Sequence, residues 1–166
     1  MARDPDRVEA LVAQWEAERP DLDLETMALA ARLLGVGRMI DARIGALAAE
    51  HGMTVGEGDI LLTLRRSGAP YRLLPTQLTG SLLVSSGTMT NRLDRLERRG
   101  LVERVPNPED RRSVEIALTD EGRELVDAVI GEHVAREQEM LAPLSARERE
   151  TLTRILRKLA AHVEAL

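Results

Sequence analysis

The stretch SSGTMTNRLDRLERRGLVERV, from Ser85 to Val105, combines small polar residues, five arginines and regularly spaced leucines before it passes into alternating residues. At 100° per residue of an α-helix, its apolar side chains fall within one narrow arc: Met89, Leu93 and Leu96. Thr88 and Asn91 lie on the opposite side, where both are poor choices for helix stability. The pattern therefore predicts a helix whose exposed face is composed for something other than stability.

The exposed residue types of this helix suit the major groove of DNA. Asn can bond adenine in a bidentate manner, Thr can contact a thymine methyl, and Arg can read guanine or hold a phosphate. A serine at the start would cap the helix and leave backbone N–H groups available for a phosphate. We expect DNA-binding residues at these positions: Ser86, Thr88, Thr90, Asn91, Arg95 and Arg98.

A solvated face held by charge pairs is the alternative interpretation of the same helix. In that case Asp94 pairs with Arg95 or Arg98, although it can also accept a hydrogen bond from a cytosine amino group. The run that follows favours DNA. Two strand-like segments, 102–105 and 114–118, flank the turn PNPEDRRS, which carries Arg111 and Arg112 at its tip. Arginines at such a tip can enter a narrow minor groove, or they can simply be solvated.

Sequence patterns that predict further helices lie on both sides of this region. Capping residues, a proline at the first helical position and apolar spacing predict helices that begin near the following residues: Asp4, Leu24, Thr54, Pro75, Thr119 and Ser145. Three helices followed by a two-stranded hairpin make a winged helix-turn-helix. Long helices at both ends of the chain carry apolar stripes that need a partner. The predicted fold is therefore mainly α (α+β), a winged helix-turn-helix with terminal helices that form a helical dimerisation region.

Three segments are expected from this order. Residues 1–53 would hold N-terminal helices for dimerisation and an effector pocket, 54–118 the winged helix-turn-helix DNA-binding domain, and 119–166 the C-terminal dimerisation helices. The chain as a whole carries a net charge of −5. From Ser86 to Arg112, however, seven arginines and five acidic residues give a local net charge of +2. A locally basic stretch can steer a protein toward phosphate even on an acidic body.

Composition narrows the function further. The chain has no cysteine, which excludes disulfides, thiol chemistry and Cys-ligated zinc. Its three histidines lack metal-ligand spacing, so we expect no metal and no cofactor. Neither a P-loop, a GxGxxG, a paired-carboxylate site nor a nucleophile–base constellation is visible, so we expect no enzymatic activity. Residues 1–20 are too charged for a signal peptide, and no run reaches the length of a membrane span, so we expect a cytoplasmic protein without membrane contact.

The segment LLVSSGTMTNRLDRLERRGLVERVPNPEDRRSVEIALTDEGREL resembles the MarR family of bacterial winged-helix transcription regulators. Its DxR wing and its LT..G exit carry the resemblance. The resemblance implies an obligate homodimer whose terminal helices interlock and whose two winged lobes read a pseudo-palindrome in double-stranded DNA. It also implies that Arg112 is the minor-groove residue of the wing tip and that Asp110 braces the wing.

The added N-terminal stretch VEALVAQWEAERPDLDLETMALAARL resembles the branch of this family that responds to urate, trans-aconitate and related carboxylates. In that branch a Trp on the added helix, an Asp on the first short helix and two Arg form the effector site. The matching positions are Trp15, Asp59, Arg92 and Arg104. In that branch the Arg on the recognition helix, which corresponds to Arg92, pairs with the Asp, and the other Arg lies near the start of the wing. The resemblance implies a small organic anion as effector, such as urate, trans-aconitate or citrate.

These four residues suggest a switch. An anion held by Arg104 near Trp15 would repel Asp59, and movement of Asp59 would disturb Arg92 and re-aim the recognition helix. The alternatives are an apolar anchor role for Trp15 in a dimer interface and a structural ion pair between Asp59 and Arg92. The expected function is a DNA-binding repressor released by a small anion. The alternatives are a drug-efflux regulator that responds to neutral phenolic ligands and a winged-helix module for protein contacts.

Overall fold

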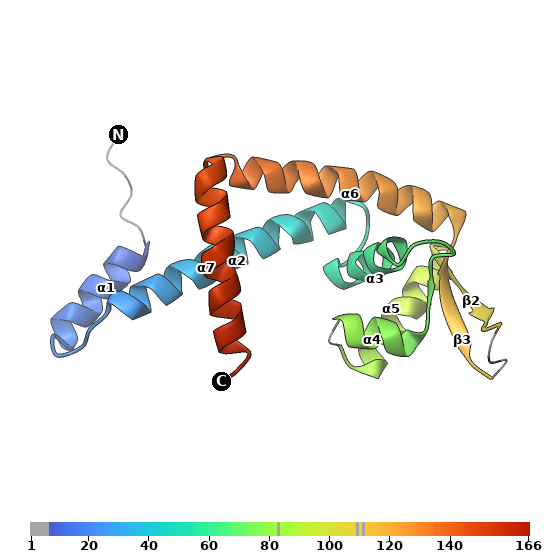
Figure 1. Cartoon of the computed structure of the whole chain (residues 1–166), viewed down its shortest axis with the longest axis horizontal. Coiled ribbons are helices and arrows are strands. Elements are labelled where there is room, and N and C mark those ends of the chain that lie inside the picture. The colour runs from blue at the N-terminus through green and yellow to red at the C-terminus, as the bar shows by residue number, and fades with distance from the viewer. Residues whose placement is uncertain (1–6, 83, 109, 111) are drawn as a thin grey trace. The chain divides into compact units, whose positions relative to one another are not determined.

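The computed structural model describes residues 7–82, 84–108, 110 and 112–166, and it is mainly helical with one small antiparallel sheet (Figure 1). The elements follow in this order: α1 (Arg7–Glu18), α2 (Glu25–Glu50), α3 (Val55–Arg66), β1 (Arg72–Leu73), α4 (Pro75–Leu82), α5 (Ser86–Arg98), β2 (Val102–Pro106), β3 (Val114–Leu118), α6 (Asp120–Leu141) and α7 (Ala146–Val163). The predicted mainly helical winged fold is confirmed. The chain divides into two units, residues 1–46 and 47–166.

The first unit consists of α1 and most of α2. The Asp4-Pro5 pair, expected to begin the first helix, lies outside the described residues. The helix ends at Glu18, shortly before Pro20, whose ring cannot continue a helix. Large apolar side chains of this unit remain exposed to solvent: Leu11, Trp15, Leu29, Leu33, Leu34, Val36 and Met39. The unit therefore carries an apolar surface that its own residues do not cover.

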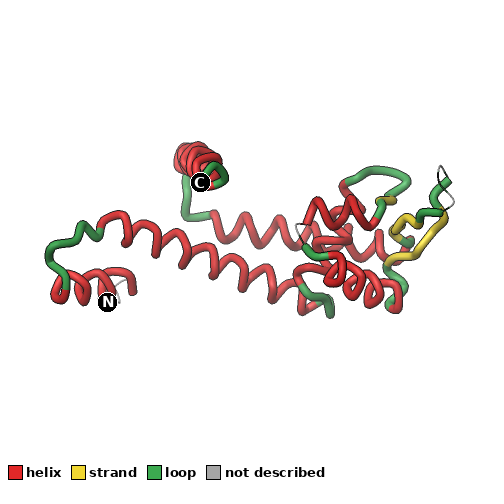
Figure 2. The backbone as a smooth tube through the Cα atoms, turned by 90° about the horizontal axis from the view of Figure 1, so that it is seen from below, coloured by secondary structure: helices red, strands yellow, loops and turns green. Residues whose placement is uncertain are grey.

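The second unit is organised around α3. The predicted capping box at its start is confirmed, because Thr54 Oγ1 accepts from the Glu57 backbone N–H while the Glu57 carboxylate accepts from the Thr54 N–H. The helix then buries Ile60, Leu61 and Leu64 completely. These side chains pack among residues of α4, α5, the sheet and α6. Figure 2 shows the strands, in yellow, as a small patch beside the helices of this unit.

The sheet has the strand order β1-β3-β2, so β3 lies in the centre. Its pairing with β2 runs antiparallel from Val102 opposite Leu118 to Pro106 opposite Val114. Strand β1 was not expected, because two residues are too short to show an alternating pattern. Tyr71, directly before β1, packs against the core and accepts a hydrogen bond from the Leu118 N–H at 3.1 Å. The loop between α3 and α4 is thereby tied to the central strand.

The LT..G motif forms the junction between the sheet and α6. Thr119 caps α6 by accepting from the Gly122 N–H, and its hydroxyl donates to the Gly100 carbonyl at 2.6 Å. A Cβ at Gly122 would fall 2.9 Å from the carbonyl carbon of Leu101 and closer still to its oxygen. Only glycine allows the first turn of α6 to approach the backbone this closely.

The second unit also contains α6 and α7. Arg65 of α3 donates to Asp127 of α6 at 2.7 Å, and the two helices lie side by side. Ser145 begins α7 with the predicted capping box, which is also confirmed. Every residue of α7 is exposed, including an apolar stripe at helical spacing: Leu152, Ile155, Leu156, Leu159 and Val163. Among the described residues, no helix combines the length and apolar character that a membrane crossing requires.

Candidate nucleic-acid interface

Helix α5 is fixed at its start and along one face. Ser85 occupies the N-cap position, and its hydroxyl accepts from the Thr88 N–H at 3.3 Å. Three of its side chains are buried in the core and set the rotation of the helix: Met89, Leu93 and Leu96. The opposite face is consequently exposed, as the sequence pattern predicts. It presents Thr88 and Asn91 to solvent at the centre of the helix.

The DNA-binding residues expected on α5 are all exposed: Ser86, Thr88, Thr90, Asn91, Arg95 and Arg98. Some of them also make contacts within the protein. Thr90 donates from its hydroxyl to the Ser86 carbonyl at 3.0 Å, and Arg98 donates from Nε to the Asp94 carbonyl at 3.2 Å. Arg95 donates from Nε to the Glu57 carboxylate at 2.7 Å. A DNA contact by Arg95 therefore has to use its remaining guanidinium nitrogens.

The wing follows α5 through β2 and β3. Arg111 lies outside the described residues, whereas Asp110 and Arg112 are described and exposed. The Asp110 carboxylate accepts from the Arg112 N–H at 3.0 Å, and its carbonyl accepts from the Ser113 N–H at 2.9 Å. These hydrogen bonds fix the backbone from which the Arg112 side chain extends.

Arg104 connects the wing to α5. From β2 its guanidinium donates to Asp94 at 2.6 Å and to Glu97, both on α5. The hydrogen bond to Asp94 raises the pKa of Arg104 above its ordinary value. We call the contacts of Arg104 with Asp94 and Glu97 the Arg104 clamp. The sequence interpretation offered Arg95 or Arg98 as a partner of Asp94, beside a cytosine amino group; the structure pairs Asp94 with Arg104 instead of either helix neighbour. The loop between α5 and β2 brings Arg104 closer than the neighbours along the helix, and local spacing carries no signal for that.

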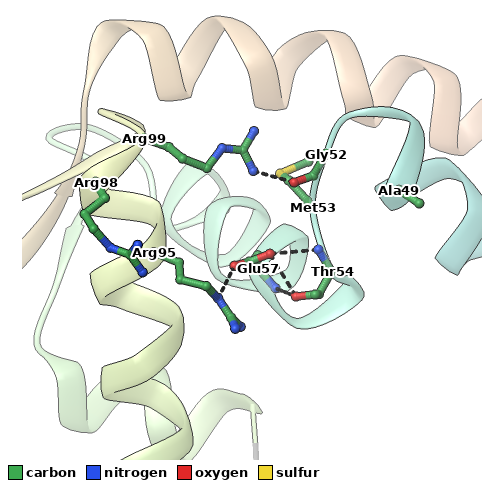
Figure 3. A pocket seen from close by; sticks show the side chains of 8 residues that line it. All are labelled: Ala49, Gly52, Met53, Thr54, Glu57, Arg95, Arg98 and Arg99. Atoms are coloured by element: carbon green, nitrogen blue, oxygen red, sulfur yellow. Dashed lines mark hydrogen bonds and ion pairs between the residues drawn. The ribbon is translucent and has the colours of Figure 1, made fainter.

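A pocket of about 510 Å³ lies where α5 faces the start of α3. It is lined by Ala49, Gly52, Met53, Thr54, Glu57, Arg95, Arg98 and Arg99 (Figure 3). Two of its arginines serve the protein itself. Arg95 neutralises Glu57, and Arg99 donates to the Gly52 and His51 carbonyls at 2.7 and 3.2 Å, at the end of α2. The contacts of Arg95 and Arg99 therefore hold α5 against the start of α3 and the loop between α2 and α3.

Glu57 is the buried charge of this region and was not expected in this role. Burial opposes its ionisation, but hydrogen bonds from the Thr54 N–H and hydroxyl and from Arg95 outweigh burial. The pKa of Glu57 consequently lies below its ordinary value of 4.5, and the side chain stays charged. The capping-box pattern in the sequence predicted the contact between Glu57 and Thr54, but nothing in the sequence indicates the pairing of Glu57 with Arg95.

The four expected effector residues belong to both units. Trp15 lies on α1 in the first unit, where 46% of its surface is exposed. Asp59 on α3, Arg92 on α5 and Arg104 on β2 belong to the second unit. Among these described residues, Asp59 and Arg92 form no ion pair; the Arg92 guanidinium instead lies against Gly56 at the start of α3. The described residues also contain no cluster of acidic or histidine side chains placed to hold a metal.

Comparison with known proteins places this geometry in a family. The model of the MarR family matches residues 53–114. The HTH-type transcriptional regulator PecS of Dickeya dadantii is 42% identical to this chain over 94% of each of the two chains. A mutant of MarR from E. coli complexed with operator DNA is 29% identical, with a TM-score of 0.68 over 82% of this chain and 96% of that one.

AbsC, a MarR family transcriptional regulator from Streptomyces coelicolor, has the same fold, with a TM-score of 0.74 over 87% of this chain and 97% of that one at 24% identity. The helix whose polar face the sequence singled out, α5, is the third helix of this winged helix-turn-helix fold. The chain belongs to the MarR family and is a DNA-binding transcriptional regulator, not an enzyme.

Proposed function

We propose that this regulator is a homodimeric repressor that binds a pseudo-palindromic operator and is released by a small organic anion. The observation that carries the proposal is the arrangement of α5. Its three buried side chains and the Arg104 clamp fix its exposed face, with Thr88 and Asn91, relative to the wing. A fixed reading face is what specific recognition of base edges requires.

The groove assignments follow from this arrangement. The exposed face of α5 would enter the major groove, with Asn91 and Thr88 reading base edges and the arginines of the helix holding phosphates. The wing tip, with Arg112 extended from the backbone that Asp110 holds, would reach the adjacent minor groove. The structure of MarR complexed with operator DNA, whose protein shares this fold, supports DNA binding by a winged helix-turn-helix of this kind.

Dimerisation is supported by the apolar surfaces that the chain leaves exposed. The stripe on α7 and the apolar side chains of α1 and α2 face solvent in a single copy. Contiguous apolar surface of this kind marks an interaction site in a water-soluble fold. A second copy of the chain would cover such surfaces, and a two-fold protein would match a two-fold operator.

The effector part of the proposal rests on Arg104. Its guanidinium holds Asp94 and Glu97 on α5, so an anion bound at Arg104 has to compete with these two carboxylates. Competition would loosen the clamp between the wing and the recognition helix and lower the affinity for the operator. Asp59 and Arg92 are the other expected effector residues of this unit: an anion at Arg104 would repel Asp59 and so disrupt the Asp59–Arg92 pair that the operator-bound state is proposed to hold. The proposed ligand class is therefore a small organic anion such as urate, trans-aconitate or citrate.

Fluorescence anisotropy on DNA from the region upstream of the gene tests this function at fixed salt and pH. Urate, trans-aconitate, citrate and salicylate are added in turn. Release by urate or by a di- or tricarboxylate supports the proposed effector class. Tight binding that all four leave unchanged would retain the DNA-binding function and refute the anionic effector.

Two alternatives are separated by further measurements. If the ligand is a neutral phenolic compound and the protein regulates drug efflux, Arg104→Ala spares the response, whereas it abolishes the response to an anion. If the winged domain serves protein contacts alone, DNA binding shows no steep salt dependence. Six to ten phosphate contacts would instead lower the affinity roughly 10³- to 10⁵-fold between 50 and 200 mM salt. Light scattering over a range of concentrations tests the dimer.

A further inference from the structure

The Arg92 guanidinium occupies space on α3 that exists because residue 56 is a glycine. A Cβ at Gly56 would fall 2.6 Å from Nη2 of Arg92 and closer still to Cζ and Nη1. Gly56 is buried, and Arg92 is the nearest group that covers it. Gly58, two residues further on the same helix, has no heavy atom within 4 Å of the corresponding position. Of these two glycines, only Gly56 has its Cβ position filled by another side chain, that of Arg92.

Asp59 lies three residues after Gly56 and so projects from the same side of α3. Its carboxylate is exposed, and within the described part of the chain no ion pair joins it to Arg92. Arg92 thus has two positions within reach on one helix face, a contact with Gly56 and a pairing with Asp59. The two contact points differ by about 4.5 Å along the axis of α3.

We propose that Gly56 is a positioning residue for the regulatory switch, because it gives Arg92 a second place to lie when it is not paired with Asp59. The inference rests on the proposed function, in which the Asp59-paired state binds the operator and an anion disrupts that pairing. The Arg92–Gly56 contact then stabilises the released orientation of α5. Because Arg92 extends from α5 itself, the position that its guanidinium occupies would bias the orientation of α5 between the bound and the released state.

Substitution at residue 56 tests the inference without removing any charged group. In Gly56→Ala the added methyl collides with the end of a flexible side chain rather than with backbone, so the fold is retained. The released state loses its contact, and the paired state gains population. We expect Gly56→Ala to bind the operator roughly tenfold more tightly and to need roughly tenfold more urate for release. Gly58→Ala receives the same gain in helix propensity and should change neither quantity.

A double-mutant cycle separates positioning from a merely structural effect. In an Arg92→Ala background there is no guanidinium to displace, so adding Gly56→Ala should leave operator affinity unchanged. Thermal unfolding of each variant checks that the fold is intact. An unchanged or weakened operator affinity for Gly56→Ala, or the same effect of Gly56→Ala with and without Arg92, would overturn the inference.

Failure of the proposed function is visible in the wild-type protein before any variant is compared. If wild type is released by neither urate nor trans-aconitate, the effector class is wrong, and the affinity cycle at residues 56 and 92 still decides the positioning role. If wild type binds no operator DNA, both proposals are refuted. If wild type binds and is released but the cycle shows no coupling, only the role of Gly56 is refuted.

Discussion

Replacing Gly122 by alanine should destabilise the protein, although alanine is the better helix former. The added Cβ would lie 2.9 Å from the carbonyl carbon of Leu101 and closer to its oxygen. Ordinary carbon–oxygen contacts lie at about 3.3–3.6 Å, so the start of α6 and the start of β2 have to separate. The Thr119 N–H, which donates to the same Leu101 carbonyl at 3.3 Å, would lose this bond.

The expected magnitude follows from opposing effects. Overpacking costs about 1–3 kcal/mol, and the lost hydrogen bond between Thr119 and Leu101 adds about 1 kcal/mol. Helix propensity returns at most about 1 kcal/mol. Gly122→Ala should therefore lower the free energy of unfolding by about 1–3 kcal/mol. Gly131 lies on the same helix with nothing within 4 Å of its Cβ position, so Gly131→Ala is the matched control and should raise stability by up to about 1 kcal/mol.

Urea unfolding followed by circular dichroism measures both variants against wild type at one protein concentration. A Gly122→Ala protein as stable as Gly131→Ala would refute the close approach between α6 and the Leu101 carbonyl. A common slope of free energy against urea is needed for the comparison, because a changed slope signals a change in the unfolded or native state rather than in the contact.

Three further predictions concern the interface and its support. Glu57→Gln should lower the free energy of unfolding by about 1–2 kcal/mol. Because folding lowers the pKa of Glu57, its contribution to stability is present above about pH 4.5 and is lost as the pH falls through the folded pKa. The acid side of a stability–pH profile should therefore flatten in the variant. Arg112→Ala should weaken operator binding and reduce the slope of log affinity against log salt by about 1, as measured by anisotropy. Ile155→Glu should shift the protein to monomers in light scattering, whereas Ala161→Glu, on the opposite side of α7, should leave the dimer intact.

Local signals predicted the helices of the fold well. Thr54, Thr119 and Ser145 each carry a cap whose geometry is decided by residues within one turn, and all three helices begin where these residues indicate. The apolar arc of α5 likewise predicted which of its side chains are buried. Such signals are local, because a cap or a helical stripe depends only on residues a few positions apart.

Contacts between distant segments were not predictable in this way. The partner of Asp94 is Arg104, ten residues away and on a strand, and the partner of Arg95 is Glu57, 38 residues earlier. Both arginines had nearer acidic neighbours on their own segments. Gly56 gave no signal at all, since its role depends on where the α5 backbone places Arg92. Side-chain pairing across elements requires the packing of the elements first.

The scarcity of aromatic residues gives each unit its own optical reporter. The chain contains one tryptophan and one tyrosine. Trp15 lies half-exposed on α1 in the first unit, whereas Tyr71 packs against the core of the second with the Arg65 guanidinium carbon 5.0 Å from its ring centroid. Selective excitation of Trp15 therefore follows the environment of α1, and tyrosine absorbance, once the overlapping tryptophan absorbance is subtracted, follows the second unit. Events in the two units can be timed separately in the unmodified protein, with no label attached.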